Sequence, residues 1–346
     1  MGKDSQAPAF RRVFEASLAD IALRTDAAER CLILSGGVDT CAILAAASTL
    51  GITFGCGITV VTGDASPDEG FSVAAAQQYA LEHHLLRISI EELIDIHLPM
   101  AVKLLETFDG MTLRNSLVIA AAFQKANALG YKHVVVGDGA DELFGGYSFT
   151  WGYEDEPQVW KEKRDAMCQT WTFATAQLAE AYGLVSHSPY TEPQTVEWAL
   201  ANTHRDDCIG THAICLVHRG KSIEHIAGKI ILREAYDTVS SWRRKDPIEV
   251  GSGITVIGKD PYWQDKVSDS EFQNQQAEAA ERGFVLKNKE HLVNFRAFEE
   301  CFGRNGVKLD KKRELGQGCA GCCFEIGDKT FCHLCGAWPA QRSKEE

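Results

Sequence analysis

The sequence predicts an α/β fold with a parallel sheet, followed by a mostly helical region and a small cysteine-rich element. Three observations lead to this prediction. Apolar segments of strand length alternate with helical patterns up to about residue 147, helical patterns then dominate, and five of the 12 cysteines lie within 319–335. Strands that alternate with helices favour right-handed crossovers and a parallel sheet covered on both faces.

The elements follow one another in a regular order. Apolar spacing predicts a helix over 8–25, and the pattern then gives strand 31–34, helix 38–50, strand 55–61, helix 69–84, strand 85–90, helix 114–129 and strand 132–137. Further along, the pattern predicts helices over 156–182, 193–202, 221–238 and 269–282. We therefore expect an N-terminal helix (1–27), an α/β domain (28–150), a helical extension (151–310) and a cysteine-rich tail (311–346).

Composition restricts the class of protein. The formal net charge of -13 disfavours a nucleic-acid binder, because such proteins neutralise phosphates with Lys and Arg. No apolar run reaches the ~20 residues of a membrane span, and the N-terminal stretch lacks the apolar core of a secretory signal. We expect a cytoplasmic protein with no membrane partner, and the sequence leaves a homo-oligomer open.

The first motif is "LILSGGVDT", residues 32–40, in which a buried strand runs into two glycines and then a helix. Glycines let backbone N–H groups approach an anion, and a helix N-terminus adds partial positive charge. Ser35 and Thr40 offer hydroxyl donors, whereas Asp39 fits beside phosphates only if Mg²⁺ lies between them. The alternative is a tight strand-to-helix turn with a serine cap.

The second motif is "VVVGDGADELFGGY", residues 134–147, in which a strand is followed by glycines and three acids, Asp138, Asp141 and Glu142. A solvated acidic turn is the plain alternative. The glycines, and the position at the carboxyl end of a parallel strand, favour a ligand site instead.

The first motif resembles the pyrophosphate loop (PP-loop) of the N-type ATP pyrophosphatases. The second resembles the Gly-Glu-Gly-Ser-Asp-Glu-x-Phe-Gly-Gly-Tyr signature of the asparagine synthetase family, and the two occur in that family's order. Four more segments are similar to the family: "DASPDEGFSVAAAQQYALEHH", "MTLRNSLVIAAA", "YGLVSHSPYTEPQTVEWAL" and "KIILREAYDTVSSWRRKDPIEVGSG". The resemblance covers roughly residues 28–255 and implies the PP-loop ATP pyrophosphatase fold of a synthetase domain.

The resemblance also implies a reaction: a substrate carboxylate attacks the α phosphate of ATP, pyrophosphate leaves, and ammonia or an amine displaces AMP to form an amide. In this reading Lys245 neutralises the leaving pyrophosphate, Arg114 steers an anionic group, and Asp39 and Asp141 hold Mg²⁺. The phosphates would lie against Ser35, Gly36, Gly37, Asp39 and Thr40, and the adenosine against Ile33, Val61, Val136 and Gly137.

The sequence departs from the family in three places. Fewer than ~30 residues precede the first predicted strand, too few for a glutaminase domain. We therefore expect nitrogen from ammonia, another amine or a separate glutaminase subunit, or a different nucleophile. Asp138 replaces the family's Glu as the group that would orient the amine. In "SHSPYTEP" the family's Arg is missing and His187 and Tyr190 are new, which leaves the acyl substrate open; for His187 we expect a structural role.

The tail "CAGCCFEIGDKTFCHLCG" contains two C-x₂-C units and resembles a zinc ribbon. The expected ligands are Cys319, Cys322, Cys332 and Cys335, with Cys323 or His333 spare. An iron-sulfur cluster would use the same thiolates, and unliganded thiols are the third alternative. The tail also raises a rival function, sulfur transfer to tRNA or a small molecule, and a non-catalytic binding module is the remaining reading.

Overall fold

The computed structural model describes residues 5–63 and 66–342, which divide into two compact units. Unit 1 comprises residues 1–87 and 122–252, and unit 2 comprises residues 88–121 and 253–346. Each unit combines segments that lie far apart in the chain. The four sequence-based domains with boundaries near 27, 150 and 310 stay a prediction.

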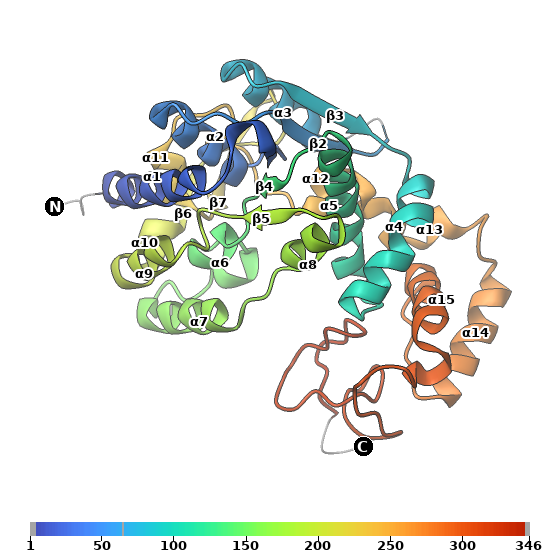
Figure 1. Cartoon of the computed structure of the whole chain (residues 1–346). Helices are drawn as coiled ribbons and strands as arrows, with labels where there is room; N and C mark the ends of the chain where they lie inside the picture. Colours follow the sequence, from blue (N-terminus) through green and yellow to red (C-terminus); the bar gives the residue numbers. More distant parts are fainter. Residues whose placement is uncertain (1–4, 64–65, 343–346) are drawn as a thin grey trace. The chain divides into compact units, whose positions relative to one another are not determined.

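Unit 1 contains a five-stranded sheet with every adjacent pair parallel, in the order β3-β2-β1-β4-β5 (Figure 1). The strands are β1 (Arg30–Ile33), β2 (Gly57–Val61), β3 (His83–Arg87), β4 (His133–Val135) and β5 (Val185–His187). The predicted α/β fold with a parallel sheet is thus confirmed. Because β1 lies between β2 and β4, the chain builds the sheet outward in one direction and then in the other. The gap between the carboxyl ends of β1 and β4 is the topological switch point, where sheets of this kind bind ligands.

Helices pack around this sheet. They are α1 (Ala7–Leu23), α2 (Val38–Leu50), α3 (Pro67–Gln78), α6 (Ala140–Leu143), α7 (Pro157–Thr170), α8 (Ala174–Ala181), α9 (Pro193–Asn202), α10 (Arg205–Cys208), α11 (Ile230–Ala235) and α12 (Ile248–Gly251), with the 3-10 turns η1 (Ala27–Glu29) and η2 (Ser148–Thr150). The second helix, α2, is apolar on nearly every side and is buried at Val38 and from Thr40 to Ala47. Helix α1 packs against α2, α9 and α11, and its Phe10 and Phe14 belong to one buried cluster with residues of those helices.

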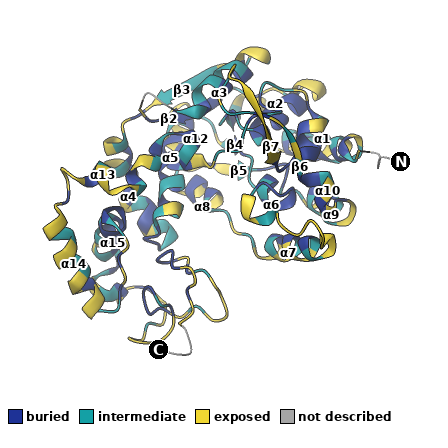
Figure 2. Cartoon of the chain, turned by 180° about the vertical axis from the view of Figure 1, so that it is seen from behind, coloured by how far each residue is buried: buried dark blue, intermediate teal, exposed yellow. Residues whose placement is uncertain are grey.

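A two-stranded antiparallel hairpin, β6 (Gly210–Cys215) and β7 (Ser222–Ala227), also belongs to unit 1. The predicted helix over 221–238 is therefore wrong in its first part, and only Ile230–Ala235 is helical. Five of the six residues of β7 are exposed (Figure 2), so the strand shows no alternation that a hydrophobic pattern could reveal. The predicted helix over 156–182 is interrupted at Trp171, which is extended.

Unit 2 is helical and ends in the cysteine-rich segment. Its helices are α4 (Ile90–Leu105), α13 (Asp260–Trp263), α14 (Asp269–Glu281) and α15 (Lys289–Phe302), with η3 (Ile254–Gly258) and η4 (Arg304–Gly306). Helix α5 (Gly110–Ala128) contributes its first part to unit 2 and its last turns to unit 1. The core of unit 2 is aromatic, with the Phe108 ring 5.0–5.3 Å from the rings of His291, Phe295 and Phe298. In the described part of the chain, no helix has both the length and the apolar character needed to cross a bilayer.

Candidate active site

The loop after β1 depends on a glycine in a left-handed conformation. Gly36 has φ +67°, and a Cβ there would lie 2.4 Å from the backbone nitrogen of Ser72 in α3. The Ser35 hydroxyl accepts a hydrogen bond from the Gly37 N–H at 3.2 Å and lies 3.3 Å from the Thr40 hydroxyl. The sequence therefore folds into a turn so tight that only glycine fits, with Asp39 in the first turn of the helix that follows.

The loop after β4 lies directly against the first loop. A Cβ on Gly137 would come within 3.0 Å of the Asp39 Cβ, and one on Gly146 would lie 1.9 Å from Asp141 Oδ1. The two glycine-rich motifs, about 100 residues apart in the chain, thus meet at the switch point between β1 and β4. The carboxylates of Asp39, from the first loop, and Asp141, from the second loop, face the same region.

A buried lysine joins these carboxylates. Lys229 Nζ lies 2.6 and 2.8 Å from the two oxygens of Asp39 and 2.8 Å from Asp141 Oδ1, and its side chain is 0% exposed. Lys245 Nζ lies 2.9 Å from Asp141 Oδ2. Burial alone would raise the pKa of Asp141, but the charges of Lys229 and Lys245 outweigh burial and lower it. Burial alone would lower the pKa of Lys245, but the charges of Asp141 and Asp39 outweigh burial and raise it. Asp141 and Lys245 therefore both remain charged.

Lys229 is the residue that the sequence analysis missed. It follows β7 with a left-handed φ of +60°, and its N–H donates to the Phe144 carbonyl at 2.9 Å. A Cβ on Gly228 would lie 1.9 Å from the Gly145 carbonyl oxygen, so the glycine lets the chain pass against the second loop. The available signal is a lone lysine after glycine in the apolar stretch "IAGKIIL".

The hairpin that ends at Lys229 also holds the segment before Lys245. The Cys215 N–H of β6 donates to the Trp242 carbonyl at 2.7 Å, and the Arg244 N–H donates back to the Cys215 carbonyl at 2.8 Å. One hairpin therefore fixes both lysines, the first through its C-terminal end and the second through its pairing with 242–244.

A buried ion pair links three of the segments that carry the resemblance. Arg243 Nη2 lies 2.5 Å from Asp68 Oδ1 of the Ser-Pro-Asp stretch, and Arg243 Nη1 donates to the Ser35 carbonyl at 3.2 Å. The guanidinium also lies over the Phe71 ring at 4.5 Å. Burial raises the pKa of Asp68 to about 6, although Arg243 opposes the rise. Arg243 thus connects the first loop, α3 and the strand-like segment before Lys245.

Side chains of the segment "SHSPYTEP" donate hydrogen bonds to backbone carbonyls of both loops. The Ser188 hydroxyl donates to the Asp138 carbonyl at 2.7 Å, and the buried Tyr190 hydroxyl donates to the Asp39 carbonyl at 2.9 Å. His187 instead pairs with His133 in the neighbouring strand, with ring nitrogens 3.1 Å apart. The contacts of His187 are therefore those of a residue within the sheet.

Asp138 stands at the start of the second loop with a perturbed carboxyl group. Burial raises its pKa to about 6, a hydrogen bond from Thr175 opposes the rise, and the charges of Glu142 and Asp141 add to it. Glu142 in turn accepts a hydrogen bond from the Tyr147 hydroxyl at 2.6 Å. A carboxyl with a pKa near 6 exchanges protons readily near neutral pH, which suits general-base work.

The residues expected around the adenosine lie at the carboxyl ends of three adjacent strands. Ile33 ends β1, Val61 ends β2, and Val136 and Gly137 follow β4. Arg114 belongs to unit 2, where its guanidinium contacts Glu290 Oε2 at 2.7 Å. The structure therefore brings Asp39, Asp141 and Lys245 together within unit 1, and it gives Arg114 a partner within unit 2.

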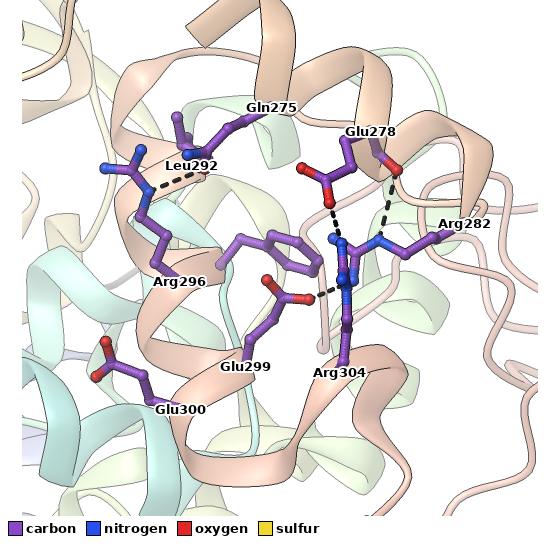
Figure 3. A pocket seen from close by; sticks show the side chains of 9 residues that line it. Gln275, Glu278, Arg282, Leu292, Arg296, Glu299, Glu300 and Arg304 are labelled. Carbon is purple, nitrogen blue, oxygen red and sulfur yellow. Dashed lines mark hydrogen bonds and ion pairs between the residues drawn. The ribbon is translucent and has the colours of Figure 1, made fainter. Parts of the chain in front are cut away.

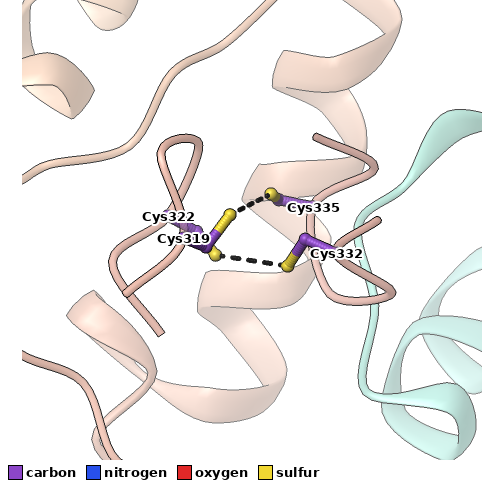
Figure 4. Close-up of side chains that lie close together, drawn as sticks. All are labelled: Cys319, Cys322, Cys332 and Cys335. Carbon is purple, nitrogen blue, oxygen red and sulfur yellow. Dashed lines mark hydrogen bonds between the residues drawn. The ribbon is translucent and has the colours of Figure 1, made fainter. Parts of the chain in front are cut away.

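Four cysteines form a compact group in unit 2 (Figure 4). Their sulfur atoms all lie within 4.8 Å of one another, with Cys319 and Cys335 3.6 Å apart and Cys322 and Cys332 3.7 Å apart. All four are buried. Cys323 points elsewhere, with its sulfur 3.2 Å from Arg342 Nη2 and 3.4 Å from the Gly283 carbonyl. These four thiols could bind a metal ion, and they are the four that the sequence predicts.

A surface pocket of about 450 Å³ lies between α14 and α15 in unit 2 (Figure 3). Four of its charged side chains pair with one another, Arg282 with Glu299 and Arg304 with Glu278. None of the predicted site residues lines this pocket.

Comparison with known proteins agrees with the two loops. The family profile described as "Asparagine synthase" matches residues 9–206. A probable glutamine-hydrolysing asparagine synthetase of Dictyostelium discoideum is 27% identical over 226 residues, which are 61% of this chain and 39% of that protein. Glutamine-hydrolysing asparagine synthetase B of Escherichia coli K12 is 26% identical over 244 residues, 68% of this chain and 41% of that protein. This region spans about two fifths of these relatives. From the profile match, the chain belongs to the asparagine synthase family.

Proposed function

We propose that this protein is an ATP-dependent ligase that joins a carboxylate to ammonia or an amine. The main support is that Asp39 and Asp141, one from each glycine-rich loop, both contact the buried ammonium group of Lys229 at the switch point. Such a pair of acids is unstable without a cation between them, so the loops are built to hold positive charge. Lys229 supplies one positive charge there, and a magnesium-bound triphosphate would add more, together with the phosphate oxygens that the first loop would hold.

The donor set fits Mg²⁺, an ion that proteins commonly hold through one or two carboxylates together with substrate phosphates and water. Asp39 and Asp141 would hold the ion, and Lys229, which contacts both carboxylates, would share them with it. When bound, Mg²⁺ would stabilise the negative charge of the phosphates. Lys245 would place a second positive charge beside the departing pyrophosphate.

The proposed reaction has two steps. In the first, a substrate carboxylate oxygen attacks the α phosphorus of ATP, the bond to the bridging oxygen breaks, and pyrophosphate leaves. In the second, the amine nitrogen attacks the acyl carbon of the mixed anhydride, and AMP leaves with the electrons of the broken carbon–oxygen bond. Asp138, with its pKa near 6, would accept the proton that the nitrogen loses.

The source of nitrogen is a further part of this proposal. The names of the similar proteins describe them as glutamine-hydrolysing. We propose that this protein uses free ammonia, an amine, or ammonia from a separate glutaminase subunit. Ammonium chloride or an amine should then support amide formation by the protein alone, whereas glutamine should do so only after a glutaminase is added. Equal activity with glutamine alone would contradict this.

We also propose that the four-cysteine group holds one zinc ion rather than an iron-sulfur cluster. Four thiolates around one tetrahedral zinc, each about 2.3 Å from the metal, lie about 3.8 Å apart. The observed separations of 3.6 and 3.7 Å match that arrangement. In a cluster the thiolates are spread over several irons and would lie farther apart. Metal analysis should give one zinc per chain, and visible absorption near 410 nm in anaerobically purified protein would contradict the assignment.

The test of the ligase proposal is a screen of carboxylic acids and amines for pyrophosphate release from ATP. The wild type should release equal amounts of pyrophosphate and AMP with at least one pair, and Asp39→Asn should lose this activity because the loop then lacks its metal-binding acid. Asp155→Asn is the matched control, since Asp155 is an exposed acid outside both loops. Activity that survives in Asp39→Asn would contradict the proposal.

A further inference from the structure

The second C-x₂-C unit of the cysteine group, Cys332 to Cys335, lies against the segment that precedes helix α5. We call this unit the knuckle. The Thr107 hydroxyl donates to the His333 carbonyl at 2.6 Å, and the Phe108 N–H donates to the Leu334 carbonyl at 2.8 Å. Both acceptors lie between Cys332 and Cys335, the two cysteines of this knuckle. The backbone that would wrap around the metal is therefore also the backbone that holds residues 107 and 108.

The same knuckle encloses the residue that caps α5. Asp109 Oδ2 accepts hydrogen bonds from the Thr112 N–H at 2.9 Å and from the Thr112 hydroxyl at 2.7 Å, and the Asp109 carbonyl accepts from the Leu113 N–H at 3.0 Å. A Cβ on Gly336 would lie 2.0 Å from Asp109 Oδ1, and Gly336 has φ +69°. The turn just after Cys335 thus requires glycine so that Asp109 can keep its capping position.

The capped turn leads directly to Arg114. Its guanidinium contacts Glu290 at 2.7 Å, and the two side chains are 14% and 3% exposed. A Cβ on Gly258 would lie 2.5 Å from Arg114 Nη1, so the guanidinium is enclosed from that side too. The side chain that the family resemblance marks as anion-steering is therefore placed by the first turn of α5.

From these contacts we propose that metal binding at the four cysteines fixes the start of α5 and, through it, the position of Arg114. This inference rests on the zinc site proposed above. Zinc would close the loop that carries the His333 and Leu334 carbonyls, because Cys332 and Cys335 would then share one ion with Cys319 and Cys322. Without the ion, the knuckle loses its tie to the opposite C-x₂-C unit, and Thr107 and Phe108 lose the carbonyl partners that order them. Arg114 is thus positioned by a metal that it does not touch.

Hydrogen exchange of the full-length protein tests this directly. We expect the amides of Phe108, Thr112 and Leu113 to exchange at least tenfold faster after zinc is removed with a chelator, and to recover when zinc is added back. Amides of α9 in unit 1 serve as the internal reference and should not change. If the exchange at residues 108–113 is the same with and without zinc, the inference fails.

A variant that leaves the cysteines intact separates positioning from folding. Thr107→Val removes the hydroxyl that donates to the His333 carbonyl, and also the acceptor of the Asp109 N–H at 3.0 Å. We expect one zinc per chain to remain while the amides at residues 108–113 lose at least tenfold in protection. Thr170→Val, an exposed threonine near the end of α7, is the matched control and should change neither quantity. Unchanged protection in Thr107→Val would overturn the proposal.

Neither readout involves ATP, so the two proposals can fail separately. Loss of protection on zinc removal in a protein without ligase activity would support the metal-dependent helix start and contradict the ligase. Ligase activity in a protein whose exchange at residues 108–113 does not depend on zinc would support the ligase and contradict the metal-dependent helix start.

Discussion

Replacing Lys229 with methionine removes a buried positive charge and keeps most of the side-chain volume. The lysine is fully buried and contacts both Asp39 and Asp141, so the substitution leaves two acids facing each other. Breaking a buried ion pair by removing one partner costs roughly 3–5 kcal/mol. Lys245 still lies 2.9 Å from Asp141, so we expect the lower end of that range, about 3 kcal/mol.

Urea unfolding followed by circular dichroism measures this loss. With a slope of about 3 kcal/mol per molar urea, a loss of about 3 kcal/mol moves the midpoint down by roughly 1 M. Lys132→Met is the matched control, because Lys132 is 64% exposed and its pairing with Glu29 is a surface ion pair, a kind worth about 0–1 kcal/mol.

Adding Asp39→Asn to Lys229→Met should restore part of the lost stability, since one of the two facing acids is then replaced by a neutral amide. Millimolar Mg²⁺ should stabilise Lys229→Met and have less effect on the double variant, because a ligand that binds only the native state stabilises it. The reasoning is refuted if Lys229→Met loses no more stability than Lys132→Met, or if the second substitution destabilises it further.

Three further predictions concern the loops and the sheet. Gly146→Ala should reduce pyrophosphate release and lower the melting temperature, because the new Cβ would overlap Asp141 Oδ1; wild-type values for both would contradict the close packing. Burial, with His133 adding to it, lowers the pKa of His187 to about 4, so the unfolded chain binds more protons between pH 6.5 and 4 and native stability falls as pH drops through that window. His187→Gln should flatten the stability profile there in urea titrations, and an unchanged slope would argue against it. Tyr190→Phe removes the donor to a backbone carbonyl in the first turn of α2 and should cost about 1–3 kcal/mol by urea unfolding; a neutral substitution would show that the carbonyl is satisfied otherwise.

The sequence was informative where one residue type has one physical use. Two glycines after a buried strand, followed by an acid, predicted the loop at Gly36, and the structure requires glycine there because of its positive φ and the backbone of α3. The second loop was predicted for the same reason, and the alternation of strands and helices predicted the parallel sheet. The alternation does not specify the order of the strands in the sheet, and β5, which has no buried residue, lacks the apolar pattern that would predict it.

Lys229 could not be assigned a role from sequence because its role depends on distant segments. Its contacts reach Asp39, 190 residues away, and require a left-handed backbone that lysine rarely adopts. The β6–β7 hairpin that delivers it exposes most of β7 to solvent, so no apolar pattern marks it. Likewise the spacing of the cysteines predicted the four grouped thiols, but that Cys323 is the spare one became evident only from its contacts with Gly283 and Arg342.

The central claim is that a carboxylate oxygen attacks the α phosphorus of ATP at the junction of the two loops. An active acid from the screen, labelled with ¹⁸O in its carboxylate, tests this in a single turnover assay read by mass spectrometry of the nucleotide product. The account predicts one ¹⁸O atom in AMP. Label in inorganic phosphate with ADP as the product, or AMP without label, would contradict it.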